Sequence, residues 1–285
     1  MTEDGFILDG DLYLPRNRTT KALIHVHGWG DTYRAWQDGS PIQFIPYLAE
    51  AARREGYAFL SVNTRGQGLE SELYNADGNV EITGSIYEIF EDCVLDIKST
   101  IDELEGMGCS SVILGGHSNG ANKVAHYETG TGDKRVKGLS LLSPTDDVGL
   151  IRHELGEEGF KRNLARARDI VMMGKGRQIM QSAYFGRDIS AQSYFDILNQ
   201  SSRYPIFNYS TGDLRILSGI QIPKLAVFGS DDGFQTKPTP REALEILDGL
   251  PNMRTVLIQG ASHRLDNRKT KLARAVKEWL EELNA

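Results

Sequence analysis

Short apolar runs alternate with amphipathic segments along most of the 285-residue chain. Six runs end in glycine or a polar turn and predict buried strands: ALIHVHG at 22–28, YAFLSVNTRG at 57–66, SVILGG at 111–116, VKGLSLLSP at 136–144, KLAVFGS at 224–230 and RTVLIQG at 254–260. Segments with helical spacing lie between or after them, at 45–55, 85–105, 119–128, 241–248 and 272–283. Because strands that alternate with helices form parallel sheets covered on both faces, the pattern predicts an α/β fold with a mainly parallel central sheet.

Two segments near the N-terminal half carry more detailed signals. Residues 6–14 read as a strand or a hairpin broken at Asp9-Gly10. The segment from Ser85 to Glu105 has the longest amphipathic period, and Ser85 is followed three residues later by Glu88, as in a capping box. We therefore expect one helix over 85–105.

Residues 146–217 interrupt the alternation, and we call this segment the insertion. It carries helical patterns and no clear buried strand, so we expect a helical layer over the C-terminal ends of the strands, where open α/β sheets bind ligands. The core then comprises 1–145 and 218–285. Most aromatic residues of the insertion are expected to form its own small core, with a minority facing the site: Tyr184, Phe185, Tyr194, Phe195, Tyr204, Phe207 and Tyr209.

Composition and charge narrow the class of protein. The formal net charge is -7 and the charges of both signs are interspersed, so the chain lacks the basic stripe of a nucleic-acid-binding protein. No apolar stretch reaches the ~18 residues that span a bilayer, and the acidic N-terminus has no signal-peptide pattern. We expect a cytoplasmic monomer or homodimer, without membrane contact. Of its two cysteines, Cys93 falls on an apolar helix face and is expected to be a buried, inert thiol.

The stretch Gly116-His117-Ser118-Asn119-Gly120 lies directly between a predicted strand and a predicted helix. A tight strand-to-helix turn holds its serine in strained backbone geometry, and flanking glycines remove side chains that would collide there. The serine hydroxyl then projects beyond the sheet, beside the N–H groups of the new helix. This context favours a nucleophile at Ser118, while a glycine-rich turn with a solvated serine is the alternative.

A serine nucleophile needs a base that is held by an acid. His263 lies in the loop after the last predicted strand, at the same edge of the sheet as Ser118, and is our candidate base. Asp231 and Asp232 follow the preceding strand, and the spacing from Gly229 favours Asp232 as the acid. The ring of His117, beside the serine, should point away from it.

The sequence offers little to bind a metal or a cofactor. His25 and His27 share one face of a strand, but no third ligand with suitable spacing accompanies them. The stretch Arg65-Gly66-x-Gly68 lacks the lysine-serine ending of a phosphate loop. We therefore expect neither a metal nor a cofactor.

The chain order Ser118, Asp232, His263 resembles that of the α/β-hydrolase superfamily, over nearly the whole chain. HVHGWGD at 25–31 resembles its His-Gly oxyanion loop, and NTRGQGLES at 63–71 resembles its Asp-x-Arg-Gly-x-Gly-x-Ser stretch, with asparagine in place of aspartate. The insertion is more loosely similar to that of a subgroup with fungal siderophore esterases.

The resemblance implies that the insertion is a cap domain and that the backbone N–H groups of Trp29 and Asn119 form an oxyanion hole. It also places His27, Gly28 and His117 beside the substrate.

These residues together predict an enzyme that cleaves a carboxylic ester of a small molecule through an acyl-enzyme intermediate. Thioester, lactone, amide or carbon–carbon bond hydrolysis and acyl transfer would use the same groups. A binding protein that keeps the fold without turnover is the alternative from another class.

Overall fold

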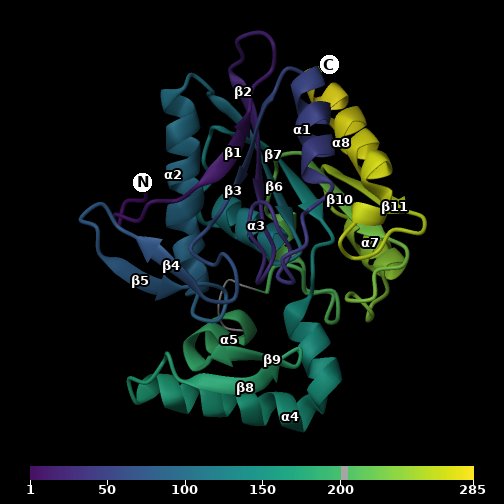
Figure 1. The fold of residues 1–285 in the computed structure, drawn as a ribbon. Helices are drawn as coiled ribbons and strands as arrows, with labels where there is room; N and C mark the ends of the chain where they lie inside the picture. The colour runs from purple at the N-terminus through teal and green to yellow at the C-terminus, as the bar shows by residue number, and fades with distance from the viewer. Residues whose placement is uncertain (200–204) are drawn as a thin grey trace.

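A seven-stranded sheet forms the centre of the computed structural model, which describes residues 1–199 and 205–285 (Figure 1). Its spatial order is β1-β3-β2-β6-β7-β10-β11, and every neighbouring pair is parallel except β1 with β3. The strands are β1 Gly10–Tyr13, β2 Lys21–Val26, β3 Ala58–Val62, β6 Ser111–His117, β7 Val136–Leu142, β10 Lys224–Gly229 and β11 Met253–Ile258. The predicted α/β fold with a mainly parallel sheet is thus confirmed.

Helices cover both faces of this sheet, because the buried strands are apolar on both sides. Along β2, Leu23 packs in the cluster with α1 and α8, whereas Ala22 and Ile24 pack in the cluster with α2, α3 and α7. The helices are α1 Ile45–Arg54, α2 Cys93–Gly106, α3 Asn119–Thr131, α7 Pro240–Asp248 and α8 Lys269–Asn284. The two-residue period of the strands therefore divides the core into two layers.

The helix predicted over 85–105 begins later than expected. The α-helix α2 starts at Cys93 and is preceded by the 3₁₀ turn η1, Phe90–Asp92. The Ser85 hydroxyl instead accepts a hydrogen bond from the Gly30 N–H at 2.7 Å and donates one to the Gly66 carbonyl at 2.6 Å. The capping-box prediction was wrong because tertiary partners take the side chain that would have capped the helix.

The N-terminal segment contributes one strand rather than a hairpin. Strand β1 pairs antiparallel with β3, with Gly10 opposite Val62. A separate hairpin, β4 Ser71–Tyr74 and β5 Val80–Thr83, was not predicted and lies near the N-terminus (Figure 1).

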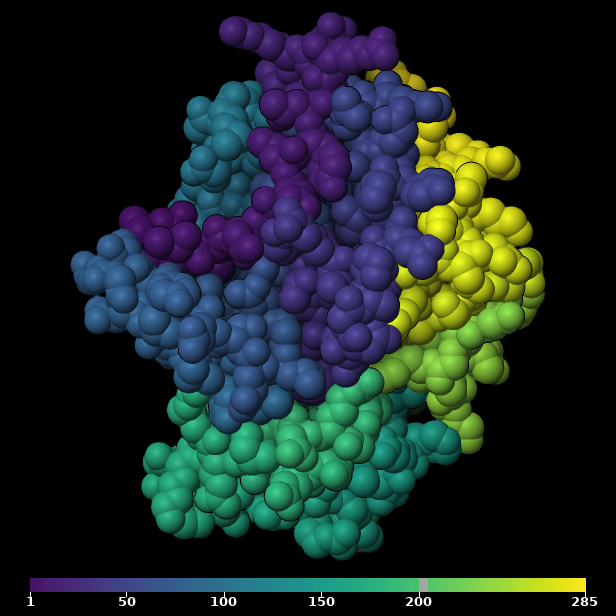
Figure 2. Space-filling model, in the orientation of Figure 1, coloured from purple at the N-terminus to yellow at the C-terminus, as the bar shows by residue number. Residues whose placement is uncertain are grey.

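The first part of the insertion forms a layer on the side of the sheet where β6 and β7 end (Figure 1). This layer is the green part at the bottom of the space-filling view (Figure 2). It contains α4 Asp147–Met172, the antiparallel hairpin β8 Ile179–Tyr184 with β9 Arg187–Ser190, and α5 Ala191–Leu198. The hairpin corrects the expectation of a purely helical layer. Its register shifts between Met180 and Tyr184, so the sequence shows no clean alternation of apolar and polar residues.

Two packing groups divide the insertion. Residues of α4, β8, β9 and α5 form a cluster that also contains Trp29, Ile86 and Phe90. The stretch from Ile206 through α6, Arg215–Ser218, packs instead in the main core, on the face of the sheet that α2, α3 and α7 cover. Residues 206–217 therefore pack with the main core, and the division into a core of 1–145 and 218–285 with a cap of 146–217 stays a prediction.

The insertion's aromatic residues divide in the same way. Tyr184 and Tyr194 are buried in its own cluster, with Phe185 and Phe195 against it, and Phe207 and Tyr209 lie in the main core. Tyr204 lies outside the described residues.

Two further predictions concern membrane-spanning helices and the Cys93 thiol. Among helices in the described ranges, none is long and apolar enough to cross a membrane. Cys93 is fully buried, as predicted, and burial raises the pKa of its thiol well above the usual value. The thiolate form that reacts is therefore disfavoured.

Candidate active site

The turn between β6 and α3 holds Ser118 in a strained conformation, with φ 53° and ψ -123°. A Cβ on Gly116 would lie 2.2 Å from the Gly120 carbonyl oxygen, and one on Gly120 would lie 2.3 Å from the Val26 carbonyl oxygen. Both positions thus require glycine for steric reasons. The turn brings the serine hydroxyl out of the sheet at the start of a helix, as its sequence context predicted.

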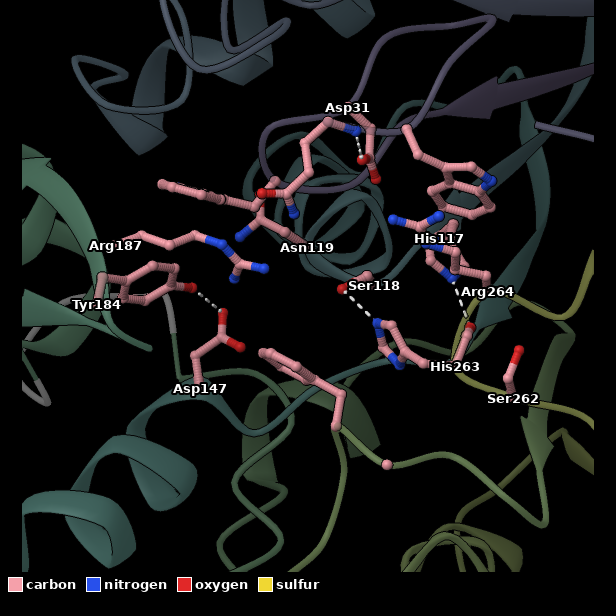
Figure 3. Close-up of a pocket in the computed structure, with 15 residues that line it drawn as sticks. Asp31, His117, Ser118, Asn119, Asp147, Tyr184, Arg187, Ser262, His263 and Arg264 are labelled. Atoms are coloured by element: carbon pink, nitrogen blue, oxygen red, sulfur yellow. Dashed lines mark hydrogen bonds between the residues drawn. The ribbon is translucent and has the colours of Figure 1, made fainter. Parts of the chain in front are cut away.

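Three residues from separate loops meet at this turn. His263 Nε2 lies 3.1 Å from Ser118 Oγ (Figure 3). On the other side of the ring, His263 Nδ1 lies 2.8 Å from Asp232 Oδ2. Asp231 is exposed, and its carboxylate accepts a hydrogen bond from the Ser230 hydroxyl instead. The structure therefore brings together the serine, histidine and aspartate favoured by the sequence, and it places Asp231 outside this chain of hydrogen bonds.

The carboxylate of Asp232 is buried and well supplied with donors. Its Oδ1 accepts the backbone N–H groups of Phe234 at 2.9 Å and Gln235 at 3.0 Å, while Oδ2 faces His263. Burial works to raise the pKa of Asp232, but the hydrogen bond and charge of His263 and the two N–H donors outweigh it, so this pKa is lowered. An ionised carboxylate fixes the Nδ1–H tautomer of His263 and leaves Nε2 to accept a proton from the serine.

His117 braces the loop of the facing histidine. Burial lowers the pKa of His117 to about 3, so its ring is neutral, and its Nε2–H donates to the His263 carbonyl oxygen at 2.9 Å. The Ser143 hydroxyl donates to the same oxygen at 3.1 Å. His117 lines the cavity described below, and its hydrogen bond holds the backbone of His263. The predicted contact of His117 with the substrate stays a prediction.

His27 begins the loop of residues 27–31, and its side chain is buried and does not line the cavity. Burial lowers its pKa to about 3. Its Nδ1–H donates to the Gly28 carbonyl oxygen at 2.8 Å, and its Nε2 accepts the Thr64 N–H at 3.1 Å. Gly28 packs closely against the turn, because a Cβ there would lie 2.9 Å from Asp31 Oδ2 and 3.3 Å from Ser118 Cβ. Both residues shape the loop rather than the cavity wall.

A cavity of about 390 Å³ opens in front of Ser118. Figure 3 shows its wall, formed by residues of the sheet edge, the loops and the insertion: Trp29, Asp31, Trp36, Gln37, His117, Ser118, Asn119, Asp147, Tyr184, Arg187, Gly233, Phe234, Ser262, His263 and Arg264. Trp29 and Asn119, the predicted oxyanion-hole residues, are both included. Asn119 is the first residue of α3, where backbone N–H groups lack partners within the helix.

The residues described do not include a cluster of three histidine, cysteine, aspartate or glutamate side chains that could hold a metal ion. His25 is buried, and its ring packs edge-on against Phe44 at a centroid distance of 5.4 Å.

Comparison with known proteins places the fold in a family. A model of the alpha/beta hydrolase family matches residues 23–275. The chain belongs to the alpha/beta hydrolase family. A search of curated proteins gave no match. The resemblance of the insertion to siderophore esterases stays a prediction.

Several solved structures share the fold of this hydrolase-family chain. Est1E from Butyrivibrio proteoclasticus with ferulic acid bound has a TM-score of 0.68 and 20% identity, over 98% of this chain and 96% of that one. A monoacylglycerol lipase from Paleococcus ferrophilus has a TM-score of 0.64 and 17% identity, over 96% and 98%. A malate-bound thermophilic esterase from Thermogutta terrifontis has a TM-score of 0.61 and 15% identity, over 98% and 95%. At such identities the likeness concerns the fold.

In this alpha/beta hydrolase, a buried ion pair beneath the site was missed by sequence reasoning. Lys123 of α3 is fully buried, and its Nζ lies 2.7 Å from Glu88 Oε1 and 3.0 Å from Thr64 Oγ1. Thr64 in turn holds His27, which holds Gly28. Lys123 thereby connects α3, the helix that follows Ser118, to the loop of residues 27–31. The only sequence signal is a lysine among small and apolar residues.

The charged lining of the cavity was also missed. Burial raises the pKa of Asp31 to about 6, and its Oδ1 accepts the Gln37 N–H at 2.9 Å. Asp147 accepts the Tyr184 hydroxyl at 3.0 Å, and Arg187 comes from the unpredicted hairpin. No local pattern marked Asp147 or Arg187, since the fold of the insertion decides that they line the cavity. Asp31 ends the 25–31 stretch, whose pattern did not indicate that this carboxylate would face the cavity.

Proposed function

We propose that this protein is a serine hydrolase that cleaves a carboxylic ester through an acyl-enzyme intermediate. The observation that carries the proposal is the hydrogen-bonded chain from Ser118 through His263 to Asp232, at distances of 3.1 and 2.8 Å. A serine hydroxyl becomes a competent nucleophile when a neutral histidine accepts its proton and a carboxylate orients that histidine.

In the acylation step, Ser118 Oγ attacks the ester carbonyl carbon while His263 Nε2 takes its proton. The carbonyl oxygen becomes an oxyanion, which the N–H groups of Trp29 and Asn119 would stabilise. Such a donor typically contributes ~3 kcal/mol to transition-state stabilisation. The C–O bond then breaks, His263 returns the proton to the leaving alkoxide, and an alcohol departs from the acylated serine.

Deacylation repeats the sequence with water. His263 removes a proton from water, the hydroxide oxygen attacks the acyl carbon, and the proton returns to Ser118 Oγ as the carboxylic acid leaves. Asp232 stays ionised and stabilises the imidazolium that forms in both steps. A cavity of about 390 Å³ suits a small-molecule ester, while the same groups would also serve a thioester, a lactone or an amide.

A fluorophosphonate probe, which forms a covalent adduct with an activated serine, tests the proposal. We expect labelling of the wild type and none of Ser118→Ala. Ser262→Ala is the matched control, because Ser262 borders the same cavity but its hydroxyl faces Asn267 at 3.4 Å. A wild type that is neither labelled nor active on 4-nitrophenyl esters, thioesters and lactones would overturn the enzyme assignment and favour a ligand-binding protein.

A further inference from the structure

Arg187 is the cationic side chain that enters the candidate active site from the insertion. It is the first residue of β9, is half-buried, and points its guanidinium into the cavity across from His263 (Figure 3). Its Cζ lies over the Trp29 ring at 5.6 Å from the centroid. Within the described ranges no carboxylate lies within ion-pair distance of it, and no hydrogen-bond acceptor contacts it.

The other charges that face the cavity have protein partners. Arg264 forms an ion pair with Asp38 at 2.8 Å and is 39% exposed. The Asp147 carboxylate accepts the Tyr184 hydroxyl at 3.0 Å and belongs to the first turn of α4, where the helix N-terminus favours negative charge. The Asp31 carboxylate accepts the Gln37 N–H. Arg187 differs from all of these, because among the described residues its guanidinium has neither an ion pair nor a hydrogen bond. Its closest contact is the Trp29 ring face, and its charge acts on Asp31 only from beyond ion-pair distance.

A guanidinium in this position is suited to a planar anion. Its N–H groups form a rigid fork that matches the two oxygens of a carboxylate, and the aromatic face holds the fork in place. A half-buried cation loses part of its hydration, so an anionic partner supplied by a ligand is favourable. Trp29 and Asn119 line the same cavity as Arg187 and Ser118, and its volume of about 390 Å³ leaves room for the uncharged part of a substrate.

We propose that Arg187 binds a carboxylate carried by the substrate, at a point away from the scissile ester. The substrate class is then an ester that is also a carboxylate anion. This inference rests on the proposed ester hydrolysis and specifies its substrate. Arg187 is a binding residue that touches the substrate but not the reacting atoms.

Matched ester pairs test the proposal and locate the carboxylate. Mono(4-nitrophenyl) glutarate carries it on the acyl part, and 4-nitrophenyl pentanoate is its neutral counterpart. In 4-acetoxybenzoate the carboxylate lies on the alcohol part, and the methyl ester of that compound is the neutral counterpart. We expect kcat/KM to favour the anionic member of at least one pair, and acetylthiocholine to be a poor substrate.

Arg187→Gln should lower kcat/KM for the favoured anionic ester roughly 10- to 100-fold, the range expected for hydrogen bonds to a charged group, chiefly through KM. The neutral counterpart should change by less than about threefold. For the anionic ester, kcat/KM of Arg187→Lys should lie between those of the wild type and Arg187→Gln, because an ammonium keeps the charge but lacks the two parallel N–H donors. The control is Arg177→Gln: Arg177 is exposed, stacks on Tyr87 at 4.2 Å and lies outside the cavity, so it should leave the preference intact.

Equal loss of activity on anionic and neutral esters in Arg187→Gln would show a structural role and overturn the inference. A wild-type preference for neutral esters, or for acetylthiocholine, would overturn it as well. None of these results affects the proposed hydrolysis, which the fluorophosphonate test addresses. If the wild type cleaves no ester, calorimetric binding of 4-acetoxybenzoate to the wild type and to Arg187→Gln still tests the anion site: equal affinity overturns it.

Discussion

Replacing Lys123 with methionine should destabilise the protein far more than an ordinary surface substitution. Methionine keeps most of the length of the side chain but removes the ammonium that lies 2.7 Å from Glu88 and 3.0 Å from the Thr64 hydroxyl. Glu88 is only 7% exposed. Removing one partner of such a buried pair leaves an uncompensated charge and typically costs about 3–5 kcal/mol.

The loss should depend on pH in a definite direction. Burial raises the pKa of Glu88 despite the opposing charge of Lys123, and removing that charge raises it further. A carboxyl whose pKa is higher in the folded state than in the unfolded state binds more protons when folded, so the free energy of unfolding falls as pH rises through this window. Lys123→Met should therefore lose more stability at pH 8 than at pH 5.5.

Urea unfolding of the wild type and the variant at both pH values measures the effect. Lys98→Met is the matched control: Lys98 pairs with Asp102 at 2.7 Å, but both side chains are more than 40% exposed. An exposed pair of this kind contributes about 1 kcal/mol or less. The double variant Lys123→Met with Glu88→Gln should recover part of the loss, because it removes the unpaired charge.

The reasoning is refuted if Lys123→Met costs no more than Lys98→Met, or if its loss is larger at pH 5.5 than at pH 8. Either result would mean that Glu88 finds other compensation. Because Lys123 supports Gly28 through Thr64 and His27, the variant should also have a lower kcat. An unchanged kcat in a destabilised variant would contradict this connection.

Two further substitutions address the proposed chemistry. Asp232→Asn should reduce kcat by about 10³- to 10⁴-fold with an unchanged Tm, because asparagine no longer fixes the tautomer of His263; Asp231→Asn should stay near wild type, and the reverse outcome in an ester assay would reassign the acid. Gly28→Ala should lower kcat/KM and the fluorophosphonate labelling rate, since the added Cβ would lie 3.3 Å from Ser118 Cβ and 2.9 Å from Asp31 Oδ2; an unchanged labelling rate would show that the loop yields without affecting the serine.

The positions of the sheet strands and of most helices could be predicted from the sequence alone. The spacing of apolar residues shows whether an element is buried on one face or on both faces. Strands β2, β6 and β10 are buried on both faces and read as continuous apolar runs. The convergence of Ser118, Asp232 and His263 could be expected from sequence for a related reason. Each follows a strand of a parallel sheet, and the carboxyl ends of parallel strands lie at one edge.

Only the tertiary structure decided what depends on partners distant in the chain. Ser85 and Glu88 match a capping box in sequence, yet Ser85 bonds to Gly30 and Gly66, and Glu88 pairs with Lys123. The position of Arg187 likewise depends on how the insertion folds back over the strands. Local sequence determines which face of an element is apolar. The environment of a polar side chain depends instead on residues distant in the chain, and a local pattern carries no information about which of them will pack against it.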